Sequence, residues 1–193
     1  KFILNINQPV ILVGSSMGCI IVSEFATRYS KLVKGVLLIG PAGFPIQVPT
    51  LAKTRDIPII GDLIFYFFGK ALIIKQNLKY FVDFKVWEEH KPFFVDQLAI
   101  TGSAETILST MRKSPVQSYI DGYKKLGQTN IPVSVVWGKE DVTFPYANHV
   151  SLKEAIPKLE IFTIESSGHL PHYERPNQVN PIILQQLKKF STN

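Results

Sequence analysis

The sequence predicts an α/β fold in which parallel strands alternate with helices. Four short apolar runs are rich in β-branched residues and bounded by Gly or Pro, which is typical of buried parallel strands. These runs occupy residues 10–13, 35–39, 133–137 and 159–164. Helical patterns lie between or after them. This alternation indicates a parallel sheet flanked by helices, with right-handed crossovers between its strands.

Three helical patterns flank the predicted strands. The first covers residues 19–29, where apolar side chains fall on one stripe that could pack on a sheet. The stripe consists of Ile21, Val22, Phe25, Ala26 and Tyr29. A second helix is predicted over residues 146–156, after Pro145, and a last one from Pro181, because proline suits the first turn of a helix. The residues of the last helix expected to face inward are Ile183, Leu187 and Phe190.

The connection between the second and third strands is too long to be a loop. Roughly ninety residues separate Ile39 from Val133, with helical patterning and many aromatic side chains. A segment of this length indicates a helical subdomain or lid. We expect most of the aromatic residues to form its own core and a minority to line an apolar substrate pocket. They are Phe65, Tyr66, Phe67, Phe68, Tyr80, Phe81, Phe84, Trp87, Phe93 and Phe94.

The composition is that of a globular chain. Its 193 residues are 46% hydrophobic, enough for a large core. The net charge of +6 is scattered, with no basic run longer than a pair, so we expect a solvated surface and no nucleic-acid partner. The single cysteine, Cys19, is expected to be small, buried and unable to form an intrachain disulfide. It is compatible with a reducing compartment, which favours the cytoplasm without deciding it.

Residues 57–74 are the only stretch that approaches the length of a membrane span. They contain Asp62 and Lys70, with Gly61 and Gly69 as breaks. Charges near the middle of a span are costly. The stretch is therefore interpreted as an apolar lid helix, with a transmembrane helix as the weaker alternative.

The chemistry is indicated by the pentapeptide Gly14-Ser15-Ser16-Met17-Gly18, which lies between the first strand and the first helix. A serine nucleophile must stand clear of the backbone, near a base and at the positive end of a helix, and a tight strand-to-helix turn meets all three needs. Gly14 and Gly18 would allow the sharp bend and close packing. The G-x-S-x-G element resembles the nucleophile elbow of the α/β-hydrolase superfamily. The resemblance implies that Ser16 is the nucleophile and that the backbone N–H of Met17 contributes to the oxyanion hole.

The same resemblance selects a base. His169 follows the last predicted strand, and the G-H pair at residues 168–169 with the later E-R-P at residues 174–176 is similar to the family pattern. His172 is the competing candidate, with a structural or pocket-lining role as its simpler interpretation. His90 and His149 are interpreted as surface or packing residues.

The acid is expected after the third predicted strand. The segment from Trp137 to Asp141 resembles the family's W-G-x-x-D element and implies Asp141 as the acid that orients the base. Glu140 is the competitor. The loop at residues 40–44, where some relatives place the acid, has no carboxylate. The order Ser16, Asp141, His169 is the Ser, acid, His order of the superfamily.

The resemblance also implies a domain organisation. Residues 1–44 would form a core segment with the elbow, residues 45–128 an inserted helical cap, and residues 129–193 a core segment with the acid and base. In the family the elbow follows several strands, whereas only Lys1 to Gln8 precede the first strand here. We therefore expect the C-terminal part of a longer protein, with residues 2–6 as the end of a helix; a complete small protein is the alternative.

Several functions are compatible with this resemblance. The leading one is a serine hydrolase that acts on a small apolar carbonyl compound, as in esterases, acylglycerol lipases and C–C bond hydrolases of ring-fission products. Ser16 argues against dehalogenases and epoxide hydrolases, which carry an Asp there; cofactor-free haloperoxidases stay open. A ligand-binding or signalling protein is the alternative of another class, since fold does not fix function.

The leading function has consequences for partners and activity. It implies no cofactor and no metal, and transient contact with a membrane or lipid surface. A second oxyanion donor would come from a loop that lies upstream of the elbow in the family. Losing one such donor typically costs about 10²–10³-fold in turnover, so we expect weak activity from these residues alone.

Overall fold

The computed structural model describes residues 8–45, 56–57 and 59–192. Four parallel strands form one sheet in the order β1-β2-β3-β4. They are β1 (Val10–Ser15), β2 (Val33–Ile39), β3 (Val133–Gly138) and β4 (Glu160–Ile164). The α/β class is thereby confirmed, and each predicted run lies within two residues of an observed strand. The expected helix end at residues 2–6 lies outside the described residues.

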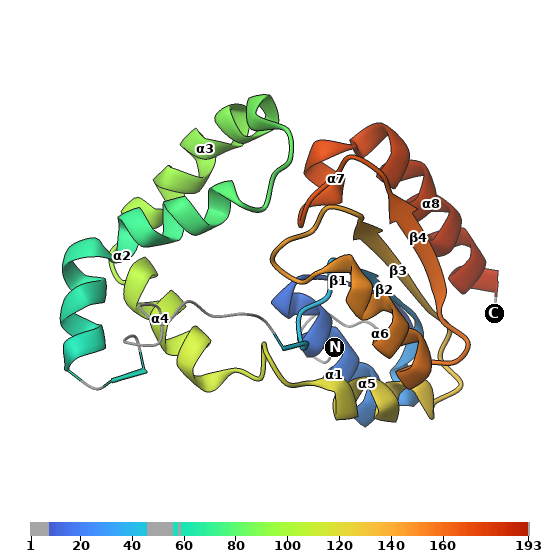
Figure 1. The fold of residues 1–193 in the computed structure, drawn as a ribbon. Helices are drawn as coiled ribbons and strands as arrows, with labels where there is room; N and C mark the ends of the chain where they lie inside the picture. Colours follow the sequence, from blue (N-terminus) through green and yellow to red (C-terminus); the bar gives the residue numbers. More distant parts are fainter. Residues whose placement is uncertain (1–7, 46–55, 58, 193) are drawn as a thin grey trace.

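Helices cover both faces of the sheet (Figure 1). Successive side chains of a strand point to opposite faces, and β2 shows this clearly. Val36 and Leu38 join the cluster under α1 (Met17–Arg28), α5 (Ile120–Gly127) and α6 (His149–Ala155). Leu37 and Ile39 join the cluster under α8 (Pro176–Thr192). The central strands are thus buried on both faces, which explains why their sequences are continuously apolar.

Helix α1 buries a different face from the predicted stripe. Its buried residues are Cys19, Ile20, Ser23 and Ala26. Ile21, Phe25 and Tyr29 of the stripe are exposed, and only Val22 and Ala26 pack against the core. The prediction was wrong because it followed the larger apolar side chains, whereas the face toward the sheet is lined largely by small ones.

The last helix starts earlier than predicted. Helix α8 begins at Pro176, and Pro181 lies inside it. Both prolines suit a first turn, so the sequence offers two starts, and the interior proline costs one backbone hydrogen bond. The inward position of Phe190 is confirmed: a Cβ on Gly35 would lie 2.3 Å from its Cγ, so α8 packs closely on β2. The helix predicted over residues 146–156 is a short η3 (Tyr146–Asn148) followed by α6.

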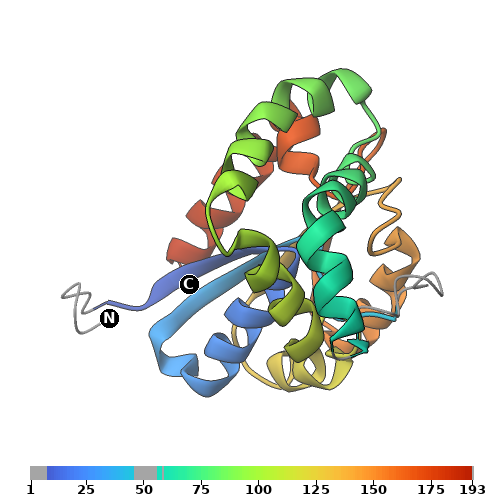
Figure 2. The same ribbon diagram turned by 90° about the vertical axis from the view of Figure 1, so that its left-hand side faces the viewer.

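The regular elements described between β2 and β3 are helices, as predicted, joined by turns and loops. Helices α2 (Ile60–Leu78), α3 (Phe84–Ala99) and α4 (Ser103–Lys113) pack against one another to one side of the sheet (Figures 1 and 2). Helix α5 instead packs against α1 and α6. The division into residues 1–44, 45–128 and 129–193 stays a prediction.

Most aromatic side chains of this segment do not form its core. Phe65, Phe81 and Trp87 are buried. Five others are largely exposed: Tyr66, Phe67, Phe68, Phe84 and Phe93. The expectation of an aromatic core was wrong, because α2 buries a narrow stripe, Gly61, Phe65, Gly69 and Asn77, that leaves the remaining faces uncovered. Among the described residues, none of the helices combines the length and the apolar character that crossing a membrane requires.

Candidate active site

Ser16 lies in a strained turn between β1 and α1. Its φ of 53° and ψ of −120° are unusual for a residue with a Cβ. The turn is held by the Ser16 N–H, which donates to the Ile39 carbonyl at 2.9 Å, and by the Ser16 carbonyl, which accepts from the Cys19 N–H at 3.0 Å. A Cβ on Gly14 would lie 2.6 Å from the Gly18 carbonyl oxygen, so the turn requires glycine there. A Cβ on Gly18 would meet none of the described atoms within 4 Å, so only Gly14 has a steric reason.

His169 approaches Ser16 from the loop after β4. Its Nε2 lies 2.9 Å from the Ser16 Oγ, although 153 positions separate the two residues. The side chain is 1% exposed. Gly40, at the end of β2 with φ of 51°, permits this approach, since a Cβ there would lie 2.8 Å from the His169 carbonyl oxygen. Strand ends at one edge of the sheet therefore bring the two residues together.

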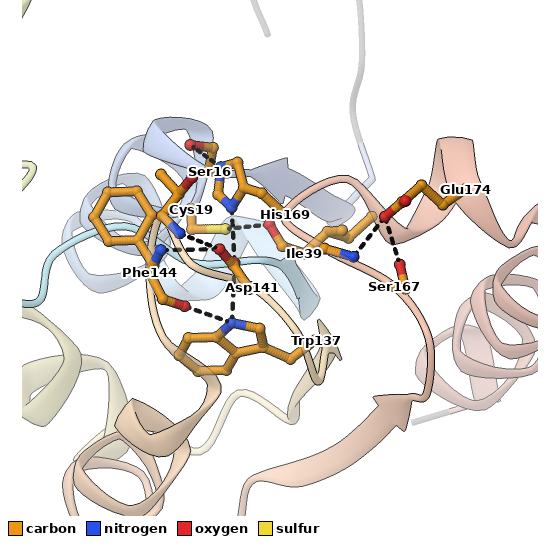
Figure 3. A network of polar contacts seen from close by, with 11 residues as sticks. Ser16, Cys19, Ile39, Trp137, Asp141, Phe144, Ser167, His169 and Glu174 are labelled. Carbon is orange, nitrogen blue, oxygen red and sulfur yellow. Dashed lines mark hydrogen bonds and ion pairs between the residues drawn. The ribbon is translucent and has the colours of Figure 1, made fainter. Parts of the chain in front are cut away.

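Asp141 lies on the other side of the His169 ring, as Figure 3 shows. Its Oδ2 is 2.8 Å from His169 Nδ1, and its Oδ1 accepts from the N–H groups of Thr143 and Phe144 at 2.8 and 2.9 Å. The carboxylate is 3% exposed. A carboxylate can only accept, so His169 Nδ1 carries the hydrogen and Nε2 is left to accept from the Ser16 hydroxyl.

Trp137 holds Asp141 in place, a role that was not predicted for it. Its Nε1–H donates to the Phe144 carbonyl at 3.0 Å and more weakly to Asp141 Oδ2 at 3.3 Å. Trp137 is fully buried at the end of β3. The W-G-x-x-D pattern contained the signal: an indole four residues before a carboxylate can donate to it across a turn.

The competing candidates have other contacts. Glu140 accepts from the Ser167 N–H at 2.9 Å and so braces the histidine loop. His149 stacks on Tyr146. These contacts agree with a packing role for His149.

His172 and His90 lie in an aromatic cluster near the site. His90 contacts Phe81, Phe94 and Tyr173, and burial lowers its pKa. Burial, with smaller contributions from His169 and His90, lowers the pKa of His172 to about 4. His172 is therefore neutral near pH 7, and its Nδ1 has no hydrogen-bond partner among the described residues.

Two aromatic rings close to His169 were not assigned to the site from the sequence. Tyr80, between α2 and α3, lies 4.9 Å from the imidazole and Phe144 lies 5.5 Å away, measured between ring centroids. Burial, and then the charge of Asp141, raises the pKa of Tyr80, so its phenol is neutral. Nothing distinguishes Tyr80 from the other aromatic residues of its segment in sequence, because its position depends on how the segment docks.

Cys19 lies behind the elbow, buried as predicted. Its Sγ–H donates to the Gly14 carbonyl at 3.1 Å, and burial raises its pKa to about 12, so it is an unreactive thiol. In the part of the chain that the structure describes, no group of three or more His, Cys, Asp or Glu side chains is arranged to hold a metal ion.

The comparisons with known proteins show the family of the chain. The model of the alpha/beta hydrolase family matches residues 1–182. The chain belongs to the α/β-hydrolase family. Among curated relatives, this α/β hydrolase is 25% identical over 211 residues to the chloroplastic pheophytinase of Arabidopsis thaliana, covering 97% of the chain and 43% of that protein. It is 23% identical over 191 residues to a monoacylglycerol lipase of Rattus norvegicus, covering 93% and 55%.

Solved structures show the same fold. An esterase from Thermogutta terrifontis superimposes with a TM-score of 0.74 at 20% identity, over 98% of this chain and 68% of that one. A meta-cleavage product hydrolase from Pseudomonas fluorescens gives a TM-score of 0.70 at 18% identity, over 94% and 65%. The chain spans about half the length of the curated relatives it matches.

Proposed function

We propose that this α/β hydrolase is a serine hydrolase that cleaves a carboxylic ester, or a related carbonyl compound with an apolar moiety, through an acyl-enzyme. One observation carries the proposal: two hydrogen bonds in series, of 2.9 Å from Ser16 to His169 and 2.8 Å from His169 to Asp141. Nucleophile, base and orienting acid in this sequence of contacts are the arrangement that activates a serine hydroxyl. In this proposal the three side chains form a catalytic triad.

In the mechanism, His169 Nε2 takes the proton of Ser16 as its Oγ attacks the substrate carbonyl. The Met17 N–H, in the first turn of α1 where backbone donors have no partner inside the helix, donates to the resulting oxyanion. Asp141 stabilises the imidazolium. His169 then gives the proton to the leaving alcohol, and the acyl group stays on Ser16. Water next attacks the acyl-enzyme, giving its proton to His169, and the acid leaves as Ser16 is protonated again.

The apolar part of the substrate is supported by the surroundings of His169. The rings of Tyr80 and Phe144 both lie close to the imidazole, with centroid distances of 4.9 and 5.5 Å. Tyr80 comes from the helical segment at residues 45–128, which we propose acts as a cap over the site. The names of the relatives, pheophytinase and monoacylglycerol lipase, are those of enzymes whose substrates would have apolar portions.

A second reaction is favoured by the fold comparison. Meta-cleavage product hydrolases superimpose with TM-scores of 0.70 and 0.67, close to that of the esterase. Hydrolysis of a C–C bond next to a carbonyl would use the same nucleophile, base and acid. The ester reaction stays the first proposal, because a Ser-His-Asp set performs it without further groups.

The test is a substrate panel with the purified protein. p-Nitrophenyl esters of increasing acyl length are compared with a vinylogous diketone of the ring-fission type. Ester hydrolysis is expected, and Ser16→Ala should lower kcat by about 10⁴-fold or more. Ser15→Ala is the matched control, since Ser15 lies one residue earlier on β1 and should retain activity. Faster turnover of the diketone than of every ester would support the second reaction instead.

Two outcomes would contradict the hydrolase proposal. Equal activity in Ser16→Ala would reject the nucleophile. Tight binding of an apolar ester with no product, unchanged in Ser16→Ala, would support the alternative of a ligand-binding or signalling protein that retains the triad for recognition.

We also propose transient contact between α2 and an anionic lipid surface. Tyr66, Phe67 and Phe68 are exposed on this helix, and the exposed Lys70 and Lys75 follow them. Aromatic rings beside basic residues favour the membrane interface. Co-sedimentation with vesicles of phosphatidylcholine and phosphatidylserine should be weakened by Phe67→Ser. Leu184→Ser, at an exposed position on α8, is the control. Equal sedimentation of both variants would contradict the proposal.

A further inference from the structure

Glu174 is a buried carboxylate outside the Ser16, His169 and Asp141 set. It ends the short α7 (Pro171–Glu174), five residues after His169, and is 4% exposed. Among the described residues its carboxylate has no ion-pair partner, and the groups that donate to it are neutral. Burying a charge in this way is costly unless every oxygen is hydrogen-bonded, and here both oxygens are.

The two oxygens of Glu174 hold two different segments. Oε2 accepts from the Gly168 N–H at 2.5 Å and from the Ser167 hydroxyl at 3.1 Å, directly before His169 (Figure 3). Oε1 accepts from the N–H groups of Val82 and Asp83 at 2.6 and 2.9 Å, where α3 begins. One carboxylate therefore joins the histidine loop to the helical segment.

The same two segments have a second link. The His169 N–H donates to the Tyr80 carbonyl at 2.8 Å. The main chains are so close that a Cβ on Gly168 would lie 2.5 Å from that carbonyl oxygen. The main chain of His169 is thus fixed from both sides, by Glu174 through Gly168 and by Tyr80 directly, while Asp141 fixes only its ring.

We propose that Glu174 is a positioning residue: it sets the main chain of His169 and makes its placement depend on the docking of residues 80–83. The inference rests on the proposed hydrolase function for its kinetic consequences. Because the docked segment carries Tyr80 against the imidazole, one carboxylate sets both the base and the ring beside it. Docking of the helical segment and alignment of the base are then a single event.

Glu174→Gln tests this role, because it removes one of the two acceptor oxygens together with the charge. A carboxamide has one acceptor oxygen, and its NH₂ group must face one of the two donor pairs. One segment therefore loses its partner whichever way the amide turns. Glu174→Asp keeps two acceptor oxygens on a side chain one methylene shorter and should restore part of the function. Arg175→Ala is the matched control: Arg175 Nη1 donates to the Glu174 main-chain carbonyl at 2.8 Å and lies 3.6 Å from Asp83 Oδ2, so it joins the same elements without using the Glu174 carboxylate.

The first measurement is the rate at which a fluorophosphonate labels Ser16, with mass spectrometry of the labelled peptide. In this reaction the Ser16 oxygen bonds to phosphorus, fluoride leaves, and His169 takes the proton. At a temperature where near-UV circular dichroism shows every variant folded, Glu174→Gln should label about 10–100-fold more slowly, since a misplaced base loses about that much. Its kcat should fall likewise with little change in KM, Glu174→Asp should recover part, and Arg175→Ala should stay within about threefold of the wild type.

The second measurement is hydrogen exchange of the amides in the two joined segments. Glu174→Gln should speed exchange both at residues 82–83 and at residues 168–169, and Arg175→Ala should leave residues 168–169 unchanged. A lower unfolding temperature with unchanged labelling rate would overturn the positioning role, and faster exchange in one segment alone would overturn the coupling. Absence of Ser16 labelling in the wild type would contradict the proposed function instead, and exchange would still test Glu174.

Discussion

The strand-end site and the helical segment beside it are built in opposite ways. Asp141 and His169 are 3% and 1% exposed. Asp141 accepts hydrogen bonds at 2.8 Å from both His169 Nδ1 and the Thr143 N–H. Tyr66, Phe67 and Phe93 of the helical segment are 74%, 70% and 72% exposed. The first region is determined by many mutually dependent contacts, and the second by a narrow buried stripe. The proposed reaction, which needs fixed distances between its groups, would thus take place in the more tightly packed of the two regions.

The largest effect on activity is expected for a substitution at the site that preserves the shape of the side chain. Asp141→Asn should lower kcat by about 10⁴-fold, because an amide can donate to Nδ1 and so favour the wrong tautomer of His169. Steady-state ester hydrolysis measures it. Glu140→Gln, one residue away and still able to accept from Ser167, should stay within about tenfold. Similar losses in both variants would reject Asp141 as the acid.

The next effect is expected at Gly14, near the end of β1 and just before the turn to α1, and it concerns stability. Gly14→Ala should lower the free energy of unfolding by about 1–3 kcal/mol, the usual cost of forcing an atom into packed surroundings, because its Cβ would lie 2.6 Å from the Gly18 carbonyl oxygen. Urea unfolding measures it.

Gly18→Ala is the control of opposite sign. Its Cβ has room among the described atoms. Because alanine favours a helix more than glycine does, the substitution should raise the free energy of unfolding by about 0.5–1 kcal/mol. If both alanines destabilise equally, the close approach at Gly14 is not the cause.

Between the two regions, His172 should make stability depend on pH. Its pKa is about 4 when folded against an ordinary 6.5, so the unfolded chain takes up the proton first as the pH falls. Stability should therefore decrease from about pH 6.5 toward pH 4. In His172→Gln this decrease should be smaller, as shown by urea midpoints at neutral and acid pH. An unchanged decrease in His172→Gln would contradict the burial of His172.

The smallest effect is expected on the exposed face of α2. Phe67→Ser should change the free energy of unfolding by no more than about 0.5 kcal/mol, as is usual for surface positions, because the ring is 70% exposed. Urea unfolding is again the measurement. A loss above about 1 kcal/mol would mean that this face is packed, and the contrast between the two regions would be weaker.

The strand ends could be predicted from local patterns, and the three candidate site residues from their places after strands together with the resemblance to the family's motifs. β-Branched runs bounded by Gly or Pro mark the strands, and parallel strands of one sheet bring their carboxyl ends to one edge. Ser16, Asp141 and His169 each follow such a run, and the structure brings them together. The start of α8 was missed because Pro176 and Pro181 both satisfy the rule for a first turn.

Contacts between distant segments could not be predicted. The buried face of α1 depends on which side chains are small enough to approach the sheet, and the stripe of large ones lies elsewhere. From the sequence, Glu174 was identified only as the first residue of the E-R-P pattern. Its role depends on Val82 and Asp83, which lie 92 and 91 positions away and reach it through the docking of another element.

The topology has one more consequence. β2 and β3 are adjacent strands, paired from Val36 with Val133 to Ile39 with Val136, although the whole helical segment lies between them in the chain. Both attachment points are therefore close in space, and the entropic cost of closing such an excursion rises by only about 0.6 kcal/mol each time its length doubles. Segments of very different size could be grafted at this junction with little thermodynamic burden on the sheet, provided each new one presents two amide hydrogens to Glu174.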